Sequence, residues 1–203
     1  MTKSRLRRAF DFAYAQAGIK RGKSEVISLL LEPTELPGEG WKRTVVHTMR
    51  SGVIGEVDEI AKRARKRGYV SAWGFFKQGS SGKGLLLKVG PLDSAADARS
   101  RVLTMEQRMT SQIRRADPAG IVSVHHDLQV PEGDSRVGLE HVISRGRYKG
   151  RNFKDVCGSV QEIYYAVGCS GPAEGWTWDE ITEVSKSQRN KIIRSQMYLK
   201  PTS

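Results

Sequence analysis

The sequence predicts an α+β protein in which helices pack against a mostly antiparallel sheet, preceded by an N-terminal helical extension. The 203 residues are 38% hydrophobic and 28% charged, which is a globular composition. Apolar and β-branched runs are separated by short glycine-rich turns, as in hairpins, and segments with helical periodicity lie between them. Hairpin connections favour antiparallel pairing. We expect an extension over residues 1–32, one α+β domain over 33–197 and a loose tail over 198–203.

The N-terminal region predicts helix. Residues 4–17 place apolar side chains at spacings of three and four, and residues 24–31 predict a short second helix with Ser24 as its cap. The basic start resembles an export signal, but polar residues interrupt the apolar region that should follow. We therefore expect a cytoplasmic protein, with an atypical or trimmed export signal as the alternative.

The middle of the chain predicts a strand, a helix, a hairpin and a longer helix. The expected ranges are 41–48 for the strand, 56–68 for the helix, 69–78 and 85–89 for the hairpin strands, and 95–113 for the long helix. Residues 79–84 form the hairpin turn, and Asp93 or Ser94 is the cap of the long helix.

The last third predicts strands followed by a helix. We expect strands over 121–130 and 138–144, an exposed hairpin loop over 145–154, and two strands over 156–157 and 160–167. Gly158 and Ser159 are expected to form a tight turn between those two strands. The final helix covers 178–195, with Thr177 as its cap.

The sequence offers no catalytic constellation, so we expect no enzyme, no cofactor and no metal site. Residues 79–84 lack the spacing of a phosphate-binding Walker loop, and no nucleophile-elbow motif is present. His125, His126 and Asp127 are adjacent, so a strand would point them to opposite faces. Two cysteines without a C-x-x-C spacing do not make a zinc site. Cys157 and Cys169 are either free cytosolic thiols or a disulfide, which would imply an oxidising compartment.

Charge is the main functional signal. The formal net charge is +12, which favours an acidic macromolecule as partner: nucleic acid, the ribosome or an acidic protein. Basic residues gather in three patches, in the N-terminal helix, at the end of the 56–68 helix and in the 145–154 loop. The candidate polyanion-binding residues are Arg5, Arg7, Arg8, Lys62, Arg63, Arg65, Lys66, Arg67, Arg145, Arg147, Tyr148, Lys149, Arg151 and Lys154.

Aromatic residues add two hypotheses. Tyr148 and Phe153 stand among the cations of the 145–154 loop, a combination that single-stranded nucleic acid binders present to phosphates and bases, and that ordinary solvated loops also show. Trp176 and Trp178 are two residues apart before a helix, so one of them is expected to face outward as a partner contact.

Several phrases carry a family resemblance. They are residues 36–41 (LPGEGW), 68–73 (GYVSAW), 91–98 (PLDSAADA), 175–180 (GWTWDE) and 188–192 (QRNKI). Across residues 33–195 the chain resembles actinobacterial proteins of the PsbP-like α/β/α type, which are related in architecture to the sensor domains of mycobacterial receptor kinases. The resemblance implies a binding or sensing role without catalysis, and it supplies no active-site residues.

Together these observations indicate a non-catalytic binding module that recognises a protein or ligand partner through a basic surface. The alternative is a basic protein associated with nucleic acid or the ribosome. Steep salt dependence of binding would favour the alternative, because each neutralised phosphate releases counterions.

Overall fold

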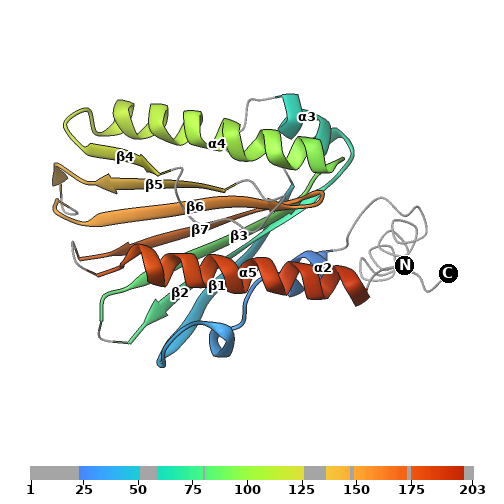
Figure 1. Cartoon of the computed structure of the whole chain (residues 1–203), viewed down its shortest axis with the longest axis horizontal. Helices are drawn as coiled ribbons and strands as arrows, with labels where there is room; N and C mark the ends of the chain where they lie inside the picture. Colours follow the sequence, from blue (N-terminus) through green and yellow to red (C-terminus); the bar gives the residue numbers. More distant parts are fainter. Residues whose placement is uncertain are drawn as a thin grey trace, which may run out of the picture.

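The computed structural model describes residues 23–50, 59–79, 81–125, 136–146, 149–172 and 175–198. Within them, one seven-stranded sheet carries helices on both faces (Figure 1). The strand order is β1-β2-β3-β7-β6-β5-β4, and every neighbouring pair is antiparallel, so the predicted fold class is confirmed. The helix expected over 4–17 lies outside the described residues.

The elements follow the predicted order closely. They are α2 (Lys23–Ser28), η1 (Pro33–Glu35), β1 (Trp41–Arg50), α3 (Glu59–Lys66), β2 (Val70–Gln78), β3 (Gly84–Pro91), α4 (Ala95–Ala116), β4 (Ile121–His125), β5 (Arg136–Val142), β6 (Asn152–Val160), β7 (Ile163–Gly171) and α5 (Trp178–Tyr198). Ser94 is the cap of α4, since its hydroxyl accepts from the Asp97 amide at 3.1 Å. Thr177 and Glu180 form a reciprocal cap at the start of α5, as the sequence predicts for Thr177.

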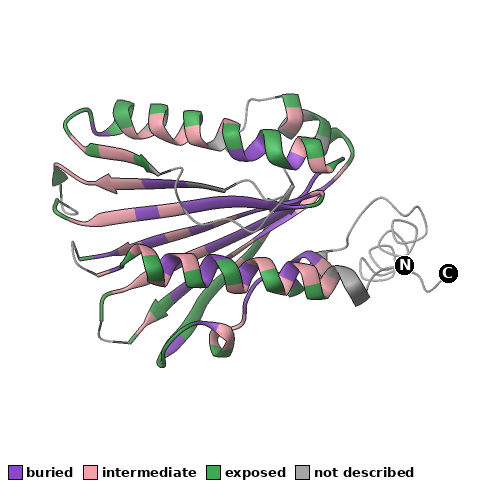
Figure 2. Cartoon of the chain, in the orientation of Figure 1, coloured by how far each residue is buried: buried purple, intermediate pink, exposed green. Residues whose placement is uncertain are grey.

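The larger core lies on the sheet face that α2 and α5 cover. Side chains alternate along each strand, so Val156 and Val160 of β6 join the apolar side of α5 in this core. Residues 26 and 29–31, which the sequence places in the extension, are buried in the same core. Figure 2 shows the central strands largely buried and the outer sides of α4 and α5 exposed.

The opposite sheet face is covered by α3 and α4 over only part of its area. α4 packs against β5, β6 and β7, where Val102 lies against Cys157. Ile60 of α3 packs on a small cluster that includes Tyr164 and Ala98. An open pocket lies on the part of this face that extends over β1, β2 and β3, beyond α3 and α4.

One predicted turn is wrong. Gly158 and Ser159 lie inside β6, and the turn to β7 falls at Gln161 and Glu162, with Gln161 at φ 50°. Gly158 is small for a packing reason, because a Cβ built on it would lie 2.6 Å from the ring of Tyr165, its partner on β7. The expected exposed loop over 145–154 is also shorter, because β6 begins at Asn152.

Candidate functional site

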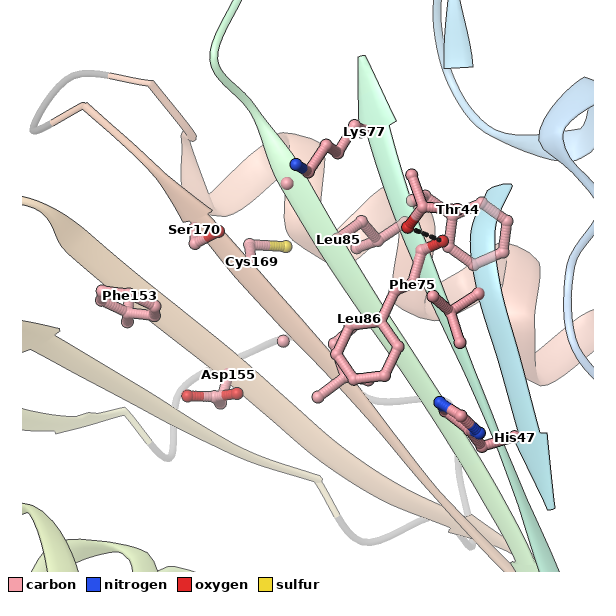
Figure 3. Close-up of a pocket in the computed structure, with 14 residues that line it drawn as sticks. Thr44, His47, Phe75, Lys77, Leu85, Leu86, Phe153, Asp155, Cys169 and Ser170 are labelled. Atoms are coloured by element: carbon pink, nitrogen blue, oxygen red, sulfur yellow. Dashed lines mark hydrogen bonds between the residues drawn. The ribbon is translucent and has the colours of Figure 1, made fainter. Parts of the chain in front are cut away.

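An open pocket lies on the sheet face shared with α4. Its volume is about 480 Å³, and five strands contribute to its lining (Figure 3). The side chains that define it are Val45 and His47 of β1, Phe75 of β2, Leu86 of β3, and Phe153 and Asp155 of β6.

The pocket is hollow because two glycines form its floor. Gly84 of β3 and Gly168 of β7 both line it. A Cβ on Gly168 would lie 2.7 Å from Asp155 Oδ1, and one on Gly84 would lie 2.8 Å from Ser170 Oγ. The bare backbone of β7 therefore leaves room for the carboxylate of the adjacent strand.

Apolar side chains line the side of the pocket nearer the sheet edge. Val45 and Phe75 are paired in register across β1 and β2, and Phe75 is paired with Leu86 of β3. Val45 is 38% exposed and Phe75 is 37% exposed, so two large apolar side chains face solvent side by side. Exposed apolar side chains that gather in a concavity mark a binding surface more often than isolated ones do.

Asp155 supplies a carboxylate on the other side of the pocket (Figure 3). Its register partner on β7 is Gly168 and on β5 is Leu139, neither of which has a polar side chain. Among the residues that the structure describes, no side chain forms an ion pair or hydrogen bond with this carboxylate. Burial raises the pKa of Asp155 to about 7, because surrounding protein atoms exclude water from the charged form.

The two cysteines are free and buried, and they lie on opposite sheet faces. Cys157 is paired in register with Ala166, whereas Cys169 is paired with Lys154. The disulfide alternative is therefore wrong for this fold. Burial raises the pKa of Cys157 to about 12 and the pKa of Cys169 well above its usual value, so neither thiol is poised as a nucleophile.

The basic patch of α3 is partly neutralised by acidic residues near the start of α4. Arg63 pairs with Asp97 at 2.7 Å and Arg67 pairs with Asp93 at 3.3 Å. Lys66 is exposed, while the side chains of Lys62 and Arg65 lie outside the description. Arg5, Arg7 and Arg8 also lie outside the described residues.

The patch of the β5–β6 connection is brought to the end of α4. Arg145 is exposed and donates to the backbone oxygen of Ala116, next to the exposed Arg114 and Arg115. Lys149 is exposed and Arg151 is partly buried; Arg147 and Tyr148 are outside the described residues. The sequence prediction did not include Arg114 and Arg115, although two adjacent arginines at the end of a helix were a visible signal.

Lys154 does not belong to a basic surface. It is buried on the α5 side of β6, where its ammonium donates to the Trp176 carbonyl oxygen at 2.6 Å and lies 3.6 Å from the Glu140 carboxylate. The same ammonium lies 5.6 Å from the ring centre of Trp178. The expectation that Lys154 contacts a polyanion is therefore wrong.

The tryptophans are packing residues. Trp176 is 6% exposed, its ring centre lies 5.7 Å from that of Trp41, and its indole nitrogen donates to Ser170. Trp178 is partly buried against the core. Trp176 does not face outward, since Trp41 packs against its ring. Trp178 keeps part of its surface exposed, so the expected partner contact at Trp178 stays a prediction.

A polar cluster that the sequence reading missed joins Asp117, His141 and Ser144. Both oxygens of Asp117 are engaged: the Ser144 hydroxyl and amide donate to them, and His141 Nε2 lies 3.2 Å away. In a serine hydrolase the serine faces the histidine, whereas here the carboxylate lies between them. The cluster therefore fastens the β5–β6 connection to the end of α4. In the described part of the chain, no three His, Cys, Asp or Glu side chains are grouped to hold a metal ion.

The comparisons with known proteins support the fold and no specific function. No family model matches the chain, and no curated protein matches it. The crystal structure of the extracellular domain of PknH from Mycobacterium tuberculosis is similar in fold, with a TM-score of 0.56 and 11% identity over 86% of this chain and 97% of that chain. This agrees with the expected relation in architecture to receptor-kinase sensor domains, while membership of the PsbP-like family stays a prediction. None of the helices described here is long and apolar enough to cross a membrane.

Proposed function

We propose that this protein is a non-catalytic binding module that takes a small, largely apolar ligand into the pocket between Phe75 and Asp155. The observation that carries this proposal is the glycine-floored hollow beside two exposed apolar side chains, Val45 and Phe75. Apolar side chains that are exposed in a concavity do not stabilise the fold by burial in its core. A ligand would bury them.

The test is a fluorescence titration with N-phenyl-1-naphthylamine, a neutral apolar dye whose emission rises in an apolar site. We expect saturable binding at one site per chain, weakened about tenfold or more in Phe75→Ser, since an exposed ring contributes roughly 1–3 kcal/mol when a ligand buries it. Ile121→Ser is the matched control, because Ile121 is also an exposed strand residue but lies on the distant edge strand β4. Absence of saturable binding, or equal loss in both variants, would contradict the proposal.

A second candidate function is contact with an acidic macromolecule, with nucleic acid in the cytoplasm as the foremost case. It is favoured by the net charge of +12 and by the hydrogen bond from Arg145 to Ala116, which brings Arg145 close to Arg114 and Arg115. The basic surface we propose consists of Arg114, Arg115, Arg145 and Lys149, all of them exposed. Arg63 and Arg67 are weaker members because acidic neighbours already pair with them.

Anisotropy of a fluorescent single-stranded RNA, measured over a range of salt concentrations, tests this second candidate. Reversal of two charges in Arg114→Glu/Arg145→Glu should weaken binding strongly and reduce the salt dependence. Lys42→Glu, on the opposite edge strand β1, is the charge control. If binding is absent, or if Lys42→Glu weakens it equally, the basic surface is not a nucleic acid site. Recovery of an acidic protein from nuclease-treated lysate would instead assign the surface to a protein partner.

A further inference from the structure

The pocket has one charged side and one apolar side. Asp155 and Phe153 are two residues apart on β6, so both face the pocket from one side, while Phe75 and Leu86 line the other side (Figure 3). Val45 also lines the pocket and is the register partner of Phe75 on β1. Asp155 is the one carboxylate among the described lining residues. A ligand that fills this space would meet an anion at one end and apolar surface at the other.

Within the part of the chain that the structure describes, the other ionisable groups on this sheet face are not paired with Asp155. Lys88 lies over the rings of Trp73 and Tyr164, Arg101 lies over Tyr164, and His141 lies against Asp117. His47 and Lys77 line the pocket from β1 and β2, across it from Asp155 (Figure 3). None of the described cations forms an ion pair with the carboxylate.

A carboxylate in such a place is costly unless a cation accompanies it. Removing it from water disfavours its charged form, and a ligand ammonium would restore a charged hydrogen-bonding partner in the same low-dielectric space. Gly168 keeps the approach open, since even a methyl group there would reach the Asp155 oxygen. Phe153 offers a ring beside the same position, and cations are attracted to the faces of such rings.

We propose that the pocket binds an amphipathic cation, a small molecule with a protonated amine on an apolar or aromatic body, with the amine at Asp155 and the body against Val45, Phe75 and Leu86. This inference rests on the proposed pocket function and names the chemical class of its ligand. It also separates the pocket from the basic surface, because an anion would be repelled by Asp155 whatever the net charge of the chain.

Three probes of matched size test the inference: 4-phenylbutylamine, 4-phenylbutan-1-ol and 4-phenylbutyrate, each used to displace N-phenyl-1-naphthylamine at pH 8. In the wild-type protein we expect the amine to bind at least tenfold more tightly than the alcohol, and the carboxylate more weakly than both. In Asp155→Asn the amine and the alcohol should bind equally, while the dye still binds. Equal binding of the amine and the alcohol to the wild-type protein would overturn the inference and leave the pocket function intact.

A pH series provides a test that needs no variant. A primary alkylamine stays protonated up to about pH 10, so a change in its affinity between pH 6 and pH 8 reports ionisation of the protein. With the pKa of Asp155 raised to about 7, affinity for 4-phenylbutylamine should rise about tenfold over this range, and affinity for the alcohol should stay constant. A flat profile with the amine bound no more tightly than the alcohol would contradict the inference, whereas a flat profile with the amine bound more tightly at both pH values would mean that Asp155 is ionised throughout and would support it. Loss of dye binding at every pH would contradict the pocket function itself.

Discussion

Gln188 of α5 holds Leu29 in place through its side-chain amide, which donates to the Leu29 carbonyl oxygen at 2.6 Å. Its side-chain oxygen accepts from the amide of Leu31 at 3.3 Å, so one fully buried glutamine satisfies two backbone groups where the chain leaves α2. This contact joins two segments at opposite ends of the sequence over the main core. It explains why a polar side chain lies on the inward side of α5.

Replacing this glutamine should destabilise the protein. Gln188→Leu leaves two buried backbone groups without a partner, and we expect a loss of about 2–4 kcal/mol in the free energy of unfolding. Urea denaturation measures it, with Ser187→Ala on the same helix as the control. A loss below about 0.5 kcal/mol would mean that water or another group replaces the amide.

Removing the charge of Asp155 should have the opposite effect. The pKa of this carboxyl is raised to about 7 in the folded state, against about 3.9 in an unfolded chain. The penalty is therefore absent below about pH 4, grows as pH rises, and is complete above about pH 7. We expect Asp155→Asn to be more stable than wild type at pH 8, by roughly 1–3 kcal/mol because Asp155 is only partly buried, and about equal to it at pH 4.

Urea midpoints at pH 4 and pH 8 check this difference. Glu183→Gln on the exposed side of α5 is the control. A stability gain of the same size at both pH values would show that the amide acts through packing rather than through charge.

Ser144 should matter only while Asp117 is ionised. Hydrogen bonds from the Ser144 hydroxyl and amide, which outweigh burial, lower the pKa of Asp117, with His141 contributing further. A lowered pKa gives stability that is present above about pH 4 and is lost as pH falls through the folded value. Thermal melting of Ser144→Ala should show a reduced Tm at pH 7, and the difference from wild type should shrink between pH 5 and pH 2. Ser123→Ala, on the nearby strand β4, should show no such dependence.

The role of Gly158 as a packing residue can be separated from a turn role. Gly158→Ala brings a methyl group against Tyr165, so we expect a loss of about 1–3 kcal/mol. In a Tyr165→Leu background the same substitution should cost much less, because the ring is gone. Equal costs in the two backgrounds, measured by urea denaturation, would exclude the steric explanation.

Both thiols should be unreactive toward thiol reagents in the folded protein. Cys157 and Cys169 are 3% and 2% exposed, and their pKa values are raised by burial. Ellman's reagent should therefore label neither cysteine in native buffer and both in guanidinium chloride. Rapid labelling of one thiol without denaturant would show local opening of β6 or β7, and failure to label in denaturant would indicate a disulfide.

The fold was largely predictable because its signals are local. The hairpin of β2 and β3, the cap of α4 at Ser94 and the cap of α5 at Thr177 each depend on a few neighbouring residues. The turn predicted at Gly158 is wrong because glycine is common both in turns and where side chains pack closely. Only the position of the Tyr165 ring shows that close packing is the reason here. The exposed position predicted for Lys154 is wrong because strand β6 begins two residues before it, within a polar sequence that is typical of a loop.

The pocket could not be predicted because it depends on register across five strands. Phe75 and Asp155 meet the same hollow only because β3 and β7 pair as they do, with Leu86 opposite Gly168. The residues adjacent to Phe75 and Asp155 in the sequence do not predict that the two side chains line one pocket. The cations and aromatic residues of the 145–154 loop are adjacent in the sequence and predict a binding site there. No sequence pattern around Asp155 predicts that it lies in a pocket.

The pairing of β3 with β7 also has a consequence for folding. In the described sheet, the first three strands meet the last four through this single seam, and it joins segments far apart in the chain. Each side contains a hairpin whose strands are neighbours in the sequence and can pair early. Pairing of β3 with β7 closes a long loop, so it costs more conformational entropy and raises the contact order of the fold. The pocket floor spans the seam, so a ligand recognises only the fully assembled sheet. Binding should therefore slow hydrogen exchange in both halves of the sheet together.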